Sequence, residues 1–184
     1  AEKAGSDALL IVTPYYNKPT QEGLYHHYKK INDSVGIPII IYNIPSRSVI
    51  DMSVDTMAKL FELKNIVGVK DATGDLNRVD QQLKAMGEDF IQLTGNDDNA
   101  FEFNKRGGVG AIGVTANIAA KLSSDFQKAC KTNVSEAKTL DKMLQPLHSS
   151  LFIESNPSPV KYAASLLGMC SPAVRLPLVE IREE

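Results

Sequence analysis

Five short apolar runs, separated by longer segments with helical periodicity, constrain the fold of this chain more than any other feature. Each run is rich in β-branched residues and almost continuously apolar, which is typical of strands buried on both faces. Strands and helices that alternate at this spacing predict βαβ units and a parallel sheet. Because crossovers are right-handed, an open doubly wound sheet and a (β/α)8 barrel remain as candidate architectures. The predicted strands are residues 7–13, 37–43, 65–71, 90–95 and 108–114.

The segments between these runs carry helix start and stop signals. Thr20 and Ser53 are suited to cap helix N-termini, and Gly36 and Gly87 are suited to end helices. Helices are therefore expected in residues 20–36, 53–63, 74–87 and 98–108. Three further helical patterns follow without an intervening strand, in residues 118–132, 134–152 and 157–168. We therefore predict a β/α part in residues 1–117 and a helical part in residues 118–184.

Composition narrows the range of partners. The chain has 184 residues, with 20 Lys and Arg against 22 Asp and Glu, so electrostatics favours neither nucleic acid nor an anionic membrane as partner. No run of 18 apolar residues predicts a membrane span, and the first residues lack the pattern of a signal peptide. The two cysteines, Cys130 and Cys170, show neither C-x-x-C nor zinc spacing. We expect a cytoplasmic protein with free thiols.

The apolar part of the third predicted strand ends in a charged residue, Lys70, within the stretch NIVGVKDATGD. In parallel α/β proteins the carboxyl ends of strands face the active site. A lysine there loses hydration, which lowers its pKa, and its neutral amine can form a Schiff base with a carbonyl compound. Tyr42 is suited to transfer protons in such a reaction, and Arg47 to bind a carboxylate. Other residues that follow predicted strands are Thr13, Tyr15, Tyr16, Asn43, Gly95, Asn96 and Asp97.

The residues alone leave two other interpretations open. Lys70 also fits a solvated strand-end residue that pairs with Asp71 or Asp75. The stretch from Gly108 to Gly113 fits G-x-G-x-x-G, the fingerprint of a nucleotide-dependent oxidoreductase. These glycines lie inside an apolar run, however, and no acidic residue follows at the required distance. They are more typical of a strand approached closely by a ligand or by another backbone.

Several long motifs resemble those of the dihydrodipicolinate synthase family, which belongs to the class I pyruvate-dependent aldolases. The motifs are VTPYYNKPTQEGLYHHY, IYNIPSRS, VGVKDATGDLNRV, LTGNDDNAF, GGVGAIGVTAN and NPSPVKYAASLLG, and they extend along essentially the whole chain in order. The resemblance implies a (β/α)8 barrel with a C-terminal helical extension. It also implies condensation of pyruvate with aspartate-4-semialdehyde in lysine and diaminopimelate synthesis, by a homotetramer built as a dimer of dimers. Neither a cofactor nor a metal is implied.

The resemblance also assigns roles to individual residues. Lys70 would form the Schiff base, Tyr42 would shuttle protons, and Tyr16 would reach into the site of a neighbouring subunit. Gly95 and Ile112 would line the pyruvate pocket. Arg47 would receive the carboxylate of the semialdehyde, and Tyr15 would lie near the cleft where lysine inhibits some members. An arginine after Y-N-I-P favours the synthases over the related N-acetylneuraminate lyases, which remain the alternative enzyme.

One departure from the family is large. Family members begin with about three further βα units, which include a Gly-Thr-Thr-Gly-Glu motif whose threonines bind the pyruvate carboxylate. The 184 residues contain no such motif, so the resemblance places them on about strands 4 to 8 of the barrel. We therefore expect these residues alone to be inactive. A non-catalytic remnant of such an enzyme is the other alternative.

Overall fold

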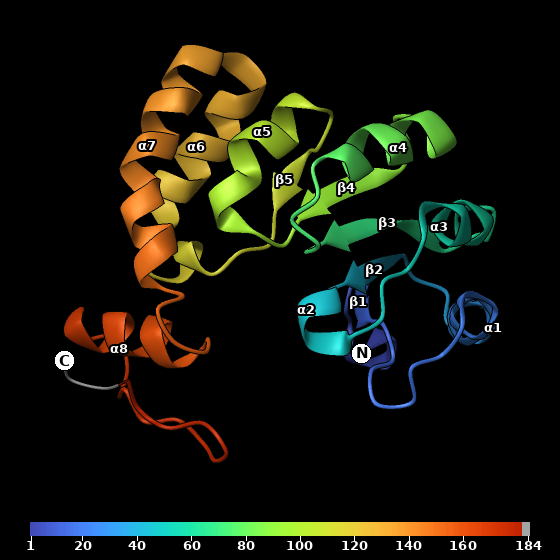
Figure 1. Ribbon diagram of the computed structural model, residues 1–184, viewed down its shortest axis with the longest axis horizontal. Coiled ribbons are helices and arrows are strands. Elements are labelled where there is room, and N and C mark those ends of the chain that lie inside the picture. The colour runs from blue at the N-terminus through green and yellow to red at the C-terminus, as the bar shows by residue number, and fades with distance from the viewer. Residues whose placement is uncertain (182–184) are drawn as a thin grey trace. The chain divides into compact units, whose positions relative to one another are not determined.

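The computed structural model describes residues 1–181, which divide into two compact units. The first unit, Ala1–Ile112, contains a parallel β-sheet with helices, and the second, from Gly113 on, is helical (Figure 1). No helix in the described part of the chain is both long enough and apolar enough to cross a membrane.

The sheet of the first unit has five strands, and every neighbouring pair is parallel. Their order in space is the order in sequence, β1-β2-β3-β4-β5. A doubly wound sheet reverses its strand order at a switch point, so the described strands do not form one. Consecutive neighbours in one direction are the arrangement of a (β/α) barrel. The strands are β1 (Leu9–Val12), β2 (Ile39–Asn43), β3 (Ile66–Asp71), β4 (Ile91–Thr94) and β5 (Gly110–Ala111).

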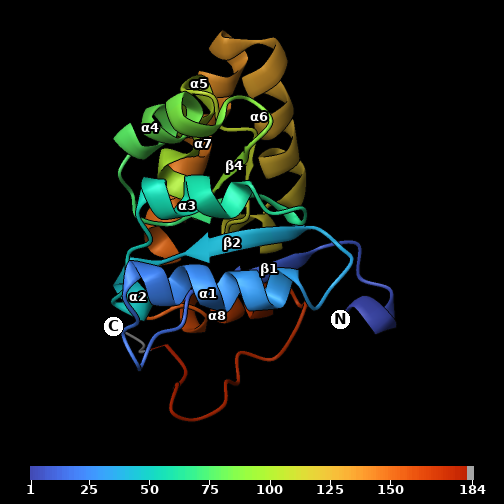
Figure 2. The same ribbon diagram turned by 90° about the vertical axis from the view of Figure 1, so that its right-hand side faces the viewer.

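Three helices of this unit, α1 (Gln21–Asn32), α3 (Val54–Phe61) and α4 (Asn77–Met86), cover the same face of the sheet (Figures 1 and 2). Two shorter helices, α2 (Pro45–Ser48) and α5 (Ala100–Lys105), follow β2 and β4. The 3-10 turns η1 (Glu2–Ala4) and η2 (Asp97–Asn99) complete the unit. The sequence predicted the four helices other than α2, which is only four residues long.

Three of the four predicted capping residues, Thr20, Ser53 and Gly87, act where expected, whereas Gly36 does not end its helix. Thr20 Oγ1 accepts a hydrogen bond from the Gly23 N–H at 3.2 Å, and Ser53 Oγ accepts one from the Thr56 N–H at 3.1 Å. Each bond satisfies a backbone donor that the first turn of a helix leaves free. Gly87 ends α4 with a φ of 77°, a conformation that favours glycine. Helix α1 is shorter than predicted and ends at Asn32.

The core of the first unit lies between the sheet and its helices. Ile39, Ile41 and Val69 pack there with residues of α1 and α3, all fully buried. The Tyr28 hydroxyl donates to the Ile11 carbonyl oxygen at 2.7 Å, which fixes α1 against β1. Because side chains alternate along a strand, the intervening residues lie on the other face of the sheet. That face is more exposed, and its apolar members include Leu10 (45% exposed), Val12 (41%), Ile91 (37%) and Ile112 (38%).

The second unit is built from η3 (Thr115–Asn117), α6 (Ala120–Thr132), α7 (Val134–Ser150) and α8 (Ser158–Leu166). As predicted, these helices follow one another without a strand. Helices α6 and α7 lie side by side, joined at Asn133, whose Oδ1 accepts from the Glu136 N–H at 3.2 Å (Figure 1). A buried hydrogen bond of 2.7 Å between Thr115 Oγ1 and His148 Nδ1 connects η3 to α7.

Strand β5 differs most from its prediction, because only Gly110 and Ala111 of the run 108–114 form a strand. Gly108 lies against Phe103 of α5, and a Cβ at this position would come within 2.1 Å of a ring carbon. The start of the apolar run therefore packs against α5, although the Val109 N–H still donates to the Gln92 carbonyl oxygen of β4 at 2.9 Å. Gly108 precedes the strand and Gly110 lies within it, so these glycines do not form the strand-to-helix turn of a dinucleotide site.

Candidate active site

Lys70 and Tyr42 lie next to each other at the carboxyl ends of adjacent strands. In the parallel ladder between β2 and β3, Tyr42 is the register partner of Lys70. The Lys70 Nζ lies 4.0 Å from the centroid of the Tyr42 ring, and only 9% of the lysine is exposed. Burial lowers the pKa of the Lys70 ammonium, and the negative charge of Asp97 acts in the opposite direction. At a given pH, more of this amine is therefore neutral and nucleophilic than in an ordinary lysine.

Tyr42 keeps its proton in this environment. Burial raises the pKa of its phenol, while the positive charge of Arg47 lowers it in part. Attack of an amine on a carbonyl gives a carbinolamine, and a protonated phenol nearby can donate a proton to its hydroxyl group, which then leaves as water. Arg47 lies in α2, directly after β2, and is exposed. The structure therefore brings three predicted residues, Lys70, Tyr42 and Arg47, to one end of the sheet.

Gly95 borders the lysine side chain. Its N–H donates to the Asp71 carbonyl oxygen at 2.7 Å, which extends the pairing of β3 with β4 by one residue. A Cβ at position 95 would lie 3.0 Å from Lys70 Cε and 2.7 Å from Ala72 Cβ. A larger residue at position 95 would therefore press on Ala72 and displace the end of the Lys70 side chain by a few tenths of an ångström. Ile112 follows β5, its N–H donates to the Thr94 carbonyl oxygen at 2.9 Å, and its side chain is half-exposed.

Tyr15 and Tyr16 are placed differently. Both follow β1, and they are 65% and 90% exposed. Neither ring makes a hydrogen bond or a ring contact within residues 1–181. The chain as described thus presents these two rings to solvent and does not bring them against Lys70 or Tyr42.

The alternative interpretation of Lys70 as a solvated partner of Asp71 or Asp75 is wrong. Asp71 lies on the helix-covered side of β3, and its Oδ2 accepts from Arg78 Nε at 3.0 Å. Asp75 Oδ1 accepts from the backbone N–H of Asn77 at 3.0 Å. Within residues 1–181, no carboxylate oxygen lies within ion-pair distance of Lys70 Nζ.

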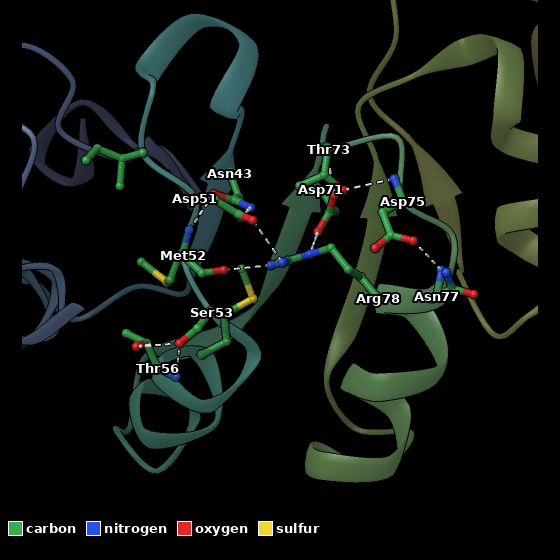
Figure 3. Close-up of polar contacts among 12 residues, drawn as sticks. Asn43, Asp51, Met52, Ser53, Thr56, Asp71, Thr73, Asp75, Asn77 and Arg78 are labelled. Atoms are coloured by element: carbon green, nitrogen blue, oxygen red, sulfur yellow. Dashed lines mark hydrogen bonds and ion pairs between the residues drawn. The ribbon is translucent and has the colours of Figure 1, made fainter. Parts of the chain in front are cut away.

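A polar network that the sequence did not predict lies on the helix-covered side of the sheet, mostly buried but with Asp51 exposed (Figure 3). We call Asn43, Asp51, Asp71 and Arg78 the Asp71 network. Arg78 of α4 contacts Asp71 and also reaches Asp51 Oδ2 at 3.3 Å and the Met52 carbonyl oxygen at 2.6 Å. Asn43 Nδ2 donates to Asp51 Oδ1 at 2.8 Å. Asp71 and Arg78 are almost fully buried, and removing one member of such a pair typically costs about 3–5 kcal/mol.

No group of three or more His, Cys, Asp or Glu residues within positions 1–181 is arranged to hold a metal ion. The reactive groups described above at the strand ends are an amine, a phenol and a guanidinium group.

All 184 residues match the Dihydrodipicolinate synthetase family. The chain belongs to this family. Two similar relatives are both 4-hydroxy-tetrahydrodipicolinate synthases. The protein from Pelagibacter ubique is 76% identical over 187 residues, which cover 100% of this chain and 64% of the relative. The protein from Afipia carboxidovorans is 61% identical, with 100% of this chain and 62% of the relative covered.

Solved structures of family members have the same fold over this part of their length. Dihydrodipicolinate synthase from Aquifex aeolicus is 43% identical with a TM-score of 0.96, covering 98% of this chain and 62% of that protein. The chloride-inhibited dihydrodipicolinate synthase from Acinetobacter baumannii, solved with pyruvate, is 46% identical with a TM-score of 0.96. The match covers 99% of this chain and 63% of that protein. The chain thus spans somewhat less than two thirds of the proteins that it matches, and its five parallel strands correspond to part of their barrels.

Proposed function

We propose that this protein condenses pyruvate with aspartate-4-semialdehyde through a Schiff base on Lys70, as a 4-hydroxy-tetrahydrodipicolinate synthase. The observation that carries the proposal is the amine of Lys70, a residue only 9% exposed, 4.0 Å from the Tyr42 ring at the carboxyl ends of parallel strands. Membership of the family and the activity named for its relatives in Pelagibacter ubique and Afipia carboxidovorans support it. In the cell this activity would serve lysine and diaminopimelate synthesis in the cytoplasm.

The proposed reaction begins when the Lys70 amine attacks the ketone carbon of pyruvate. The resulting carbinolamine loses water, with Tyr42 donating a proton to the leaving hydroxyl, and forms a protonated imine. Loss of a methyl proton gives an enamine, whose carbon attacks the aldehyde carbon of the semialdehyde. The amino group of the semialdehyde then attacks the imine carbon, which closes the ring and releases Lys70.

The other predicted residues fit supporting roles. Gly95 leaves the space that the lysine side chain needs, and Ile112, which follows β5, would line the pyruvate pocket with an apolar side chain. Arg47 is an exposed residue just after β2, and its guanidinium would bind the carboxylate of the semialdehyde through charge-assisted hydrogen bonds. Tyr16, with 90% of its surface exposed, is available to enter the site of a neighbouring subunit in a homotetramer, and Tyr15 to line an inhibitor cleft.

The proposal is tested by borohydride reduction of the full-length protein in the presence of pyruvate. We expect a stable adduct on Lys70, located by peptide mass spectrometry, and none on Lys64 or Lys161. Because burial lowers the pKa of Lys70, the rate of adduct formation should rise with pH and level off at a pH below 10.5, the pKa of an ordinary lysine. A label on another lysine, or none in a folded protein, would contradict the proposal.

A further inference from the structure

The Asp71 network joins the residues that directly follow the two proposed catalytic side chains. Asn43 comes after Tyr42 in β2, and Asp71 comes after Lys70 in β3. Because successive side chains in a strand point to opposite faces, Asn43 and Asp71 lie on the helix-covered side of the sheet. They are register partners of each other, as Tyr42 and Lys70 are on the opposite side.

Each end of this pair is held by several contacts. Asp71 Oδ1 accepts from the Thr73 N–H at 2.9 Å and from Thr73 Oγ1 at 2.6 Å, and Oδ2 accepts from Arg78 Nε at 3.0 Å and Gln82 Nε2 at 3.3 Å. Asn43 uses both ends of its amide, because Nδ2 donates to Asp51 Oδ1 and Oδ1 accepts from the Met52 N–H at 3.1 Å. Neither side chain can rotate without losing hydrogen bonds in a buried environment.

Arg78 connects the contacts of Asp71 with those of Asn43 (Figure 3). Its guanidinium contacts Asp71 with Nε and Asp51 with the first terminal nitrogen, and the second donates to the Met52 carbonyl oxygen. On the sheet side, the Ala72 N–H donates to the Asn43 carbonyl oxygen at 2.8 Å. The backbones that carry Tyr42 and Lys70 are therefore fixed to each other through side chains as well as through the ladder.

We propose that the Asp71 network positions Tyr42 and Lys70, so that Arg78 acts in catalysis through their relative placement without touching the substrate. This inference rests on the roles proposed above for Lys70 and Tyr42. The planar guanidinium bonds in three directions and holds Asp71 of β3 to Asp51 and Met52, which in turn bond Asn43 of β2. The single ammonium group of lysine cannot reproduce this arrangement. A small displacement of one reacting group relative to another can slow a reaction by about a hundredfold.

The test compares Arg78→Lys with a matched control, Arg106→Lys, in the full-length protein. Arg106 also contacts a carboxylate, Asp80, at 2.7 Å, but this pair is exposed and not connected to Asn43 or Asp71. We expect Arg78→Lys to slow formation of the pyruvate adduct on Lys70 by about tenfold or more at temperatures well below its Tm. Arg106→Lys should leave the rate unchanged. A lower Tm with an unchanged rate would show that Arg78 only stabilises the fold.

A double-mutant cycle with Tyr42→Phe separates positioning from a general structural effect. If Arg78 acts through the placement of Tyr42 against Lys70, Arg78→Lys should slow the Tyr42→Phe protein by less than about threefold. Equal rate losses in both backgrounds would overturn the inference.

A measurement without pyruvate distinguishes this inference from the proposed function. Lys70 can be acetylated with acetic anhydride at a series of pH values, and its labelling read by mass spectrometry against a surface lysine. If pyruvate gives no adduct even in the parent protein, the proposed function fails, but the positioning inference still expects Arg78→Lys to raise the pH midpoint of Lys70 labelling toward that of an exposed lysine. An unchanged midpoint would overturn the inference.

Discussion

At the scale of single residues, a lysine that ends an apolar strand either finds an anion or loses part of its hydration. Strand alternation decides between these outcomes here, because Asp71 lies on the opposite face of β3 and is bonded to Arg78. The position of Lys70 beside Tyr42 follows from the strand pattern and could be predicted. The partner of Asp71 could not, because Arg78 is brought to it by the packing of α4 against the sheet.

Gly95 is the residue whose replacement tests the geometry of the lysine most directly. A methyl group at this position would lie 3.0 Å from Lys70 Cε and 2.7 Å from Ala72 Cβ, so the lysine must move. We expect Gly95→Ala to slow formation of the pyruvate adduct by about tenfold or more. The measurement is the rate of borohydride-trapped labelling of the full-length protein as pyruvate concentration varies.

Gly110→Ala is the matched control for this substitution. Gly110 lies in the neighbouring strand β5, but a Cβ there would meet only a flexible methyl group of Leu93, at 3.3 Å. This variant should label at nearly the parent rate. Equal losses in the two variants would show that any added bulk in this part of the sheet is harmful, and that Gly95 has no special relation to Lys70.

At the scale of elements, the predictions succeeded where a helix has a cap and a clear apolar face. Thr20, Ser53 and Gly87 mark helix ends that the structure confirms within a few residues. Helix α2 was missed because four residues are too few for a periodic pattern. The run 108–114 was predicted too long, because Gly108 packs closely against Phe103, and this contact depends on tertiary structure.

Asn65 connects the end of α1 to the start of β3. Its side chain is buried, and Nδ2 donates to the Asn32 and Val35 carbonyl oxygens at 3.0 and 2.9 Å. Asn65→Ala would leave two buried acceptors without these donors, which should lower the free energy of unfolding by about 1–3 kcal/mol. The measurement is the midpoint of chemical unfolding of the full-length protein, with the exposed Asn77→Ala as control. Equal midpoints for the two variants would contradict this role of Asn65.

At the scale of the whole molecule, the order of the strands and the one-sided placement of the helices agree with the barrel that the motifs implied. The apolar pattern could predict a parallel sheet, but it could not choose between a barrel and a doubly wound sheet, because that choice depends on which strands become neighbours. The face opposite the helices, with Leu10, Val12 and Ile91 each more than a third exposed, is the inner face of a barrel in the solved relatives' fold.

The last prediction concerns the 184 residues expressed alone. Their sheet has two open edges, β1 and β5, and an exposed apolar face that carries Lys70 and Tyr42. Open edges and apolar faces favour association between copies. We therefore expect a self-associating product without a cooperative melting transition and without pyruvate labelling of Lys70. Size-exclusion chromatography with light scattering, thermal melting and borohydride trapping measure these three properties.

Two variants and a fusion protein test whether the exposed face of the sheet causes the self-association of the 184-residue chain. Val12→Lys places a charge on that face and should reduce association, whereas Val134→Lys changes an exposed valine of α7 and should not. Fusing the part of the Pelagibacter ubique relative that this chain does not match should restore a single species and the Lys70 adduct, because the added strands would cover the apolar face and pair its edges. A monodisperse, cooperatively melting and labelled 184-residue chain would show instead that the exposed face is stable in water and that the residues of the site act without a closed barrel.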